Sequence, residues 1–170
     1  MKRHFATFAL LLAFAAPALA DWPAGMLSPK NVTYDKFKDK TTVLIEVGDV
    51  NPGGSGRVTM FVGLRYKGDT TSGTPEAIGM HFRSGNRFDA VYQVGAIALA
   101  GSKRIEIGES RDNATFSRGS ETHVVSYMSS VTQVIEMASG PTLEIQVGRR
   151  ELALSSSQMA TMQAIAESVK

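Results

Sequence analysis

Period-two alternation of apolar side chains is the feature that most constrains the fold of this chain. Val43, Ile45 and Val47 share one face of residues 42–50, and every second side chain from Val58 to Tyr66 is apolar, so that each segment has one apolar face. Such alternation predicts β-strands with one buried face. Residues 51–56, between the two segments, are rich in glycine and predict a loop. The two segments therefore predict a long hairpin.

Further strands are predicted by the same pattern, although over shorter segments: 77–83, 88–94, 103–107 and 122–128. Polar residues dominate the stretches 67–76 and 109–120, which we predict to be loops.

Two helices are predicted in the C-terminal third by their N-terminal signals. Ser130 and Gln133 have the spacing of a capping box, and so do Ser155 and Gln158. The first helix is expected to end at Gly140, which proline follows. The second is expected to continue to about residue 169, with an apolar stripe at helical spacing.

A second hairpin is predicted between these helices, from residues 142–147 and 150–154. Gly148 begins its two-residue turn, which favours a type II′ conformation. This register places Ile145 opposite Leu152, so apolar and polar residues separate onto different faces. The fold class predicted is therefore α+β. We expect an antiparallel β-rich sheet or sandwich with a short helix, a C-terminal hairpin and a C-terminal amphipathic helix.

The first 20 residues have the three parts of a cleavable secretory signal peptide. Lys2 and Arg3 precede an apolar run over residues 5–16, and Ala18 and Ala20 form the small-residue cleavage pattern. The alanine-rich signal favours a bacterial source and a periplasmic or secreted location. We expect residues 21–40 to be an irregular lead-in and residues 41–170 to be a single domain, with no membrane span after cleavage.

Charge and cysteine content exclude several classes of function. The whole chain has 18 basic and 16 acidic residues, and the first 20 residues hold two of the basic ones. The mature chain would therefore be formally neutral, which gives no support for nucleic-acid binding. The absence of cysteine excludes thiol nucleophiles and cysteine-based zinc sites.

Basic residues in the middle of the chain are the candidate ligand-binding residues. If the turn after residue 83 lies beside the strand over 103–107, an anion could bind between them. The residues concerned are Arg83, Arg87, Lys103 and Arg104.

His81 and His123 are the weak candidates for a metal site or for acid–base chemistry. With Asp89 or Asp112, either histidine could serve a small periplasmic hydrolase. The chain has neither the short histidine spacings of zinc enzymes nor a serine-nucleophile motif, so no catalytic residue is assigned. The Met80–His81 pair offers a soft ligand for Cu(I), but alternation assigns Met80 to the core.

Three functions follow from these residues as hypotheses. The first is a non-catalytic binding or accessory protein of the bacterial envelope, acting through contacts with another envelope or secreted protein. Its motivation is a scaffold with long polar loops and without a catalytic motif. The alternatives are the small hydrolase and an envelope carrier of a small anion or metal. No cofactor is expected, and the sequence does not set the oligomeric state.

Overall fold

The structure, a computed structural model, describes residues 31–51, 56–85, 95–108, 110–117 and 120–170. Side chains are described for all of these residues except those within 110–121. The signal peptide predicted over residues 1–20 and the strand predicted over 88–94 lie outside the described residues. The elements are β1 (Asn31–Asp35), β2 (Lys40–Asp49), β3 (Val58–Lys67), β4 (Ala77–Ser84), β5 (Ala96–Ala100), β6 (Lys103–Ile107), β7 (Ser110–Ser117), β8 (Ser120–Ser129), α1 (Val131–Ser139), β9 (Leu143–Val147), β10 (Arg150–Ala153) and α2 (Ser156–Ser168).

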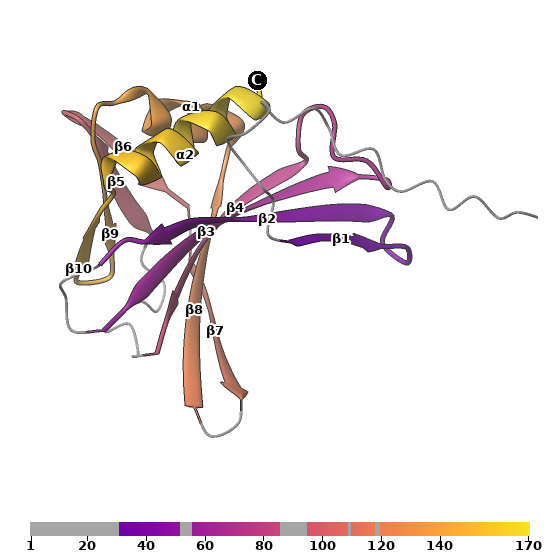
Figure 1. The fold of residues 1–170 in the computed structure, drawn as a ribbon, viewed down its shortest axis with the longest axis horizontal. Helices are drawn as coiled ribbons and strands as arrows, with labels where there is room; N and C mark the ends of the chain where they lie inside the picture. The colour runs from indigo at the N-terminus through magenta and orange to yellow at the C-terminus, as the bar shows by residue number, and fades with distance from the viewer. Residues whose placement is uncertain (1–30, 52–55, 86–94, 109, 118–119) are drawn as a thin grey trace, which may run out of the picture.

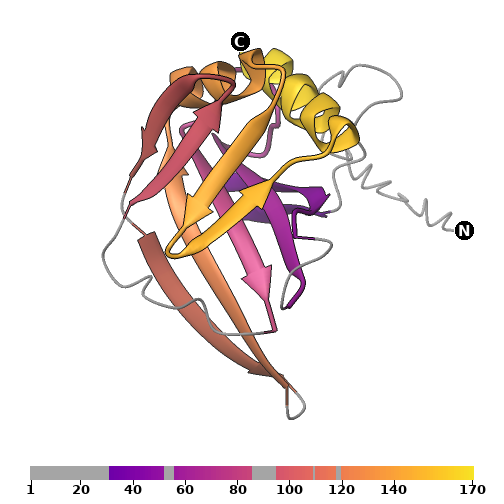
Figure 2. The ribbon, with the colours of Figure 1, turned by 90° about the vertical axis from the view of Figure 1, so that its left-hand side faces the viewer.

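The strands form two antiparallel sheets, and the α+β prediction is confirmed. The larger sheet has six strands in the order β1-β2-β3-β4-β8-β7, and the smaller has four in the order β10-β9-β5-β6. The smaller sheet packs beside one face of the larger one, and the two helices lie together across the top of both (Figures 1 and 2). The larger sheet is strongly twisted, so that the hairpin of β7 and β8 descends away from β1 and β2 (Figure 1).

One hydrophobic core joins both sheets and both helices. In β2 and β3 the side chains that the alternation assigned to the apolar face are buried, from Val43 to Val47 and from Val58 to Tyr66. Thr59 and Phe61, on the other face of β3, are buried as well. The smaller sheet contributes Leu143, Ile145 and Leu152 to the same core.

Both helices begin as the sequence predicts. The side chain of Ser130 accepts a hydrogen bond from the backbone N–H of Gln133, whose side chain accepts one from the backbone N–H of Ser130. Ser155 and Gln158 repeat this capping box at α2. In the described parts of the chain, no helix is long and apolar enough to cross a membrane.

Each capping glutamine also ties its helix to a strand. Gln133 Nε2 donates to the Glu106 carbonyl in β6 at 2.7 Å. Gln158 Nε2 donates to the Asp49 carbonyl at the end of β2 at 2.6 Å. One amide side chain therefore satisfies a helix N-terminus and a strand carbonyl together, which fixes the helix relative to the sheet.

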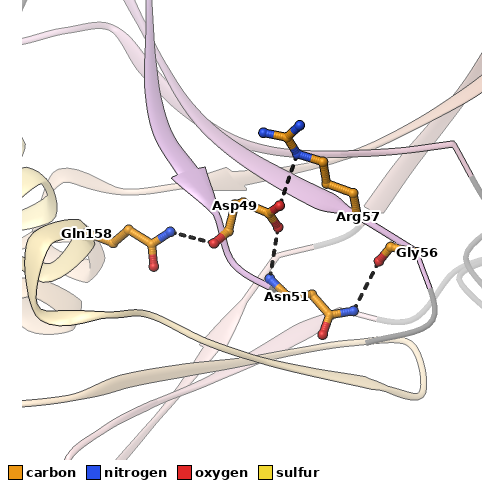
Figure 3. A network of polar contacts seen from close by, with 5 residues as sticks. All are labelled: Asp49, Asn51, Gly56, Arg57 and Gln158. Atoms are coloured by element: carbon orange, nitrogen blue, oxygen red, sulfur yellow. Dashed lines mark hydrogen bonds and ion pairs between the residues drawn. The ribbon is translucent and has the colours of Figure 1, made fainter. Parts of the chain in front are cut away.

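The Asp49 end of β2 gathers a small polar network (Figure 3). The Asp49 carboxylate accepts from the backbone N–H of Asn51 at 3.2 Å and pairs with Arg57 Nε at 3.0 Å. Asn51 Nδ2 donates to the Gly56 carbonyl at 3.2 Å. These contacts close the connection between β2 and β3 at the point where Gln158 of α2 attaches.

The hairpin of β9 and β10 has the predicted register. Ile145 pairs with Leu152, and the backbone N–H of Leu154 donates to the Leu143 carbonyl at 3.0 Å. Gly148 has a φ of 61°, and Arg149 is not among the residues of positive φ, as a type II′ turn requires.

Three segments differ from the sequence predictions. Residues 110–117, predicted as part of a loop, form β7, an edge strand that pairs with β8 alone. Residues 31–35, predicted as irregular, form the other edge strand, β1. An edge strand is held by a backbone ladder on one side, so a mainly polar sequence can form one. The strand β5 was not predicted, because its inward residues are alanines, which are weak strand formers.

Candidate functional site

A groove of about 820 Å³ crosses the outer face of the six-stranded sheet, which faces away from the helices and the smaller sheet. We call it the outer-face groove. It extends from the edge strand β1 to β8, across the polar faces of the strands between them. Its lining residues are Asn31, Thr33, Asp35, Thr42, Leu44, Glu46, Phe61, His81, Arg83 and Val124.

The middle of the groove is apolar and aromatic. Phe61 of β3 lies directly opposite His81 of β4, and Leu44 and Val124 are half-buried on either side. The Arg83 guanidinium lies over the Phe61 ring, 4.8 Å from its centroid. This cation–π contact holds the guanidinium over the groove floor, and Phe61 is only 8% exposed.

His81 is seated on two glycines. A Cβ atom on Gly63 or on Gly79 would lie 2.8 Å from His81 Nε2, so the ring occupies space that only glycine leaves open. His81 Nδ1 lies 2.8 Å from Ser126 Oγ of β8. Burial, and then the charge of nearby Arg65, hold the pKa of His81 below its ordinary value of 6.5. The imidazole is therefore neutral at neutral pH.

His81 and His123 lie on opposite faces of the sheet. His81 is on the outer face, whereas His123 alternates with Val125 and Tyr127 on the inner face and is only 4% exposed. The pairing of β4 with β8 aligns Ser84, not His81, with His123. The two histidines that the sequence singled out therefore do not share a site. Among the described residues, no group of three histidine or acidic side chains is placed to hold a metal ion.

The four basic candidate residues are separated as well. Arg83 lies in the outer-face groove, but Lys103 and Arg104 belong to β6 in the other sheet. There Lys103 pairs with Glu136 at 2.8 Å and Arg104 with Glu106 at 2.5 Å. Arg87 lies outside the described residues.

Phe61, Arg65 and Ser126 are site residues that the sequence reasoning missed. The available signal was the same alternation that identified the core, because all three lie on the polar faces of predicted strands. The polar faces of β3, β4 and β8 become one surface only when the strand order is known.

The His81–Ser126 pair has the elements of a base and a hydroxyl within hydrogen-bond reach. The described contacts of the imidazole are with that hydroxyl and the two glycines, and not with a carboxylate. Asp89 and the side chain of Asp112, the carboxylates considered for a hydrolase, lie outside what the structure describes. The geometry provides a well-held neutral histidine at the floor of a groove.

Comparison of the chain with known protein families, with curated proteins and with solved structures finds no match. The groove and its chemistry are therefore the basis for the functional proposal that follows.

Proposed function

We propose that this chain is an exported, non-catalytic binding protein of the bacterial envelope that holds an extended segment of another exported protein in its outer-face groove. The observation that carries the proposal is the groove itself, with its apolar middle and Arg83 stacked over Phe61. The N-terminal 20 residues support export.

The size and lining of the groove suit a ligand rather than a random surface hollow. Ligand sites commonly have volumes of about 300–1,000 Å³, with an apolar lining and a few placed polar groups. The groove of about 820 Å³ lies within this range. It lies on rigid paired strands, so that little conformational freedom is lost when a partner binds.

Charges divide the groove into two ends. At the β4 end, Arg83 presents a guanidinium, which binds carboxylates with two parallel hydrogen bonds. At the β1 end the charged lining residue is Asp35, whereas Glu46 of β2 is the register partner of Phe61 and lines a neighbouring pocket together with Arg83. The best-fitting segment therefore places apolar side chains over Leu44 and Val124 and a carboxylate at Arg83.

Selection from a display library of extended peptides tests this proposal. We expect the chain to enrich peptides with apolar residues followed by Asp or Glu. Arg83→Glu should reverse the preference at that end, so that basic residues replace acidic ones. Arg149→Glu, in the exposed turn between β9 and β10, is the matched control and should select the same peptides as the unmodified chain. Recovery of no consensus peptide, or the same consensus with Arg83→Glu, would refute the proposal.

A second candidate function, a small hydrolase, is favoured by one contact, the 2.8 Å approach of His81 Nδ1 to Ser126 Oγ. If this pair is nucleophilic, a fluorophosphonate probe should label Ser126, and His81→Gln should abolish the labelling. Absence of label on the unmodified chain removes this candidate and leaves the binding function unaffected.

A further inference from the structure

The tip of the hairpin between β1 and β2 carries two exposed aromatic side chains. We call residues 34–39 the hairpin tip. Phe37 is 89% exposed and Tyr34 is 45% exposed. Within the described residues the other exposed large hydrophobic side chains are Leu99 of β5 and Met128 of β8, and neither belongs to this hairpin. The hairpin tip lies at the far end of the hairpin from the helices (Figure 1).

The hairpin tip is held in one conformation by its own hydrogen bonds. Asp35 Oδ1 accepts from the backbone N–H groups of Phe37 at 3.0 Å and Lys38 at 3.3 Å. Tyr34 donates its hydroxyl proton to Asp39 at 3.0 Å, and the Asp39 carbonyl accepts from the N–H of Gly68 at 2.8 Å. Phe37 is therefore presented to solvent from a rigid support.

Two lysines flank Phe37 in the chain. Lys36 Nζ lies 5.2 Å from the centroid of the Phe37 ring. Lys38 Nζ pairs with the Asp35 carboxylate at 3.5 Å, and the Lys38 side chain is 77% exposed. The two carboxylates of the hairpin tip accept hydrogen bonds from within it. Two lysines therefore flank the exposed aromatic ring, while Asp35 and Asp39 leave the hairpin tip formally neutral.

We propose that the hairpin tip docks on an anionic lipid bilayer, with Phe37 inserted at the boundary of headgroups and acyl chains and Lys36 and Lys38 at the lipid phosphates. Aromatic rings and flanking lysines are the combination that membrane interfaces accommodate, since lysine extends its charge to the headgroups. A protein partner fits less well, because lysine is depleted from the centres of protein interfaces.

This proposal is independent of the outer-face groove as a binding site, but it places that groove near the lipid surface. Asp35 is part of both features, since it belongs to the hairpin tip and lines the groove. One aromatic anchor with two lysines gives weak, reversible attachment. The docked chain would present its groove to partners at the membrane.

Sedimentation with vesicles of phosphatidylglycerol and phosphatidylcholine tests the inference. The chain is purified after export, and its N-terminus is determined by mass spectrometry, so that a retained signal segment does not contribute. We expect binding that increases with the fraction of phosphatidylglycerol and decreases with salt. Phe37→Ala should lower the partition coefficient roughly 10- to 100-fold. Lys36→Gln with Lys38→Gln should lower it about 10-fold or more on anionic vesicles.

Matched controls separate the hairpin tip from general surface effects. Leu99→Ala removes another exposed apolar side chain, and Arg149→Gln removes a charge from a different turn. Neither should change binding, and the melting temperature of Phe37→Ala should equal that of the unmodified chain. The proposal is overturned if the unmodified chain does not bind anionic vesicles, if it binds neutral vesicles equally, or if Phe37→Ala binds as the unmodified chain does.

Discussion

Replacing Gln158 by glutamate tests whether the link between α2 and β2 stabilises the fold. The change keeps the oxygen that accepts from the backbone N–H of Ser155, so the capping box is retained. It removes the Nε2 donor and places a carboxylate oxygen against the Asp49 carbonyl oxygen. In the unmodified chain, Gln158 Nε2 and this carbonyl oxygen are 2.6 Å apart. The side chain is 8% exposed, so water has little access to relieve the contact.

The expected effect can be worked from these contacts. Loss of the hydrogen bond removes about 1 kcal/mol, and leaving a buried carbonyl unsatisfied costs about 1–3 kcal/mol. The new negative charge at the N-terminus of α2 stabilises the helix by about 0.3–1 kcal/mol, which offsets part of this loss. The net loss in the free energy of unfolding is about 2 kcal/mol, or about 4–8 °C in melting temperature for a domain of this size.

Urea and thermal unfolding, followed by circular dichroism, measure this loss. Gln133→Glu is the matched control, because Gln133 makes the same two contacts at α1 but is half-buried. Its loss should stay below about 1 kcal/mol, since water can reach the Glu106 carbonyl. The penalty of Gln158→Glu should also shrink as the pH falls towards about 4, because the contact with the Asp49 carbonyl raises the pKa of the folded carboxyl and the protonated acid can donate to that carbonyl. Equal losses for the two substitutions, or a Gln158→Glu loss below about 0.5 kcal/mol, would refute the reasoning.

Three further predictions concern the site and the core. Burial lowers the pKa of His81, so this residue contributes stability that is present above about pH 6.5 and lost as the pH falls through its folded pKa. Urea unfolding of His81→Gln should therefore show a free energy of unfolding that depends less on pH in this range. Parallel pH curves for the variant and the unmodified chain would contradict this prediction. Gly79→Ala places a Cβ 2.8 Å from His81 Nε2 and should lower the free energy of unfolding by about 1–3 kcal/mol and shift the imidazole NMR signals. Gly85→Ala is the control: its Cβ meets nothing within 4 Å, so it should change neither the stability nor the NMR signals. Leu152→Ala empties a site that is 1% exposed and should lower the free energy of unfolding by about 2–5 kcal/mol; a loss below 1 kcal/mol would contradict its place in the core.

The parts of the fold that the sequence predicted are those encoded locally. Alternation identifies β2 and β3, because a strand with one buried face must repeat every two residues. The capping serines and glutamines identify both helix starts for a similar reason, since the contacts span three residues. The edge strands β1 and β7 carry little such signal, and their pairing is fixed by neighbours distant in the chain. Local reasoning therefore fails at the edges of the sheet.

The sequence identified two residues of the candidate site but neither their neighbours nor their arrangement. His81 and Arg83 were both identified, yet the partners assigned to them lie elsewhere: His123 is on the inner face and Lys103 is in the other sheet. The deciding fact is that β4 lies between β3 and β8, which brings Phe61 and Ser126 to His81. That order depends on packing of the whole core, and a sequence pattern contains no record of it.

The hydrogen bond from Gln158 to Asp49 also sets the time at which the fold can be completed. The two residues are 109 positions apart, and α2 is the last element of the chain. At about 5–20 residues per second, synthesis reaches Gln158 roughly 5–20 s after Asp49. Throughout this interval the end of β2 has no helix to close it. The contact that ties α2 to the end of β2 therefore forms only after all the other described elements have been synthesised.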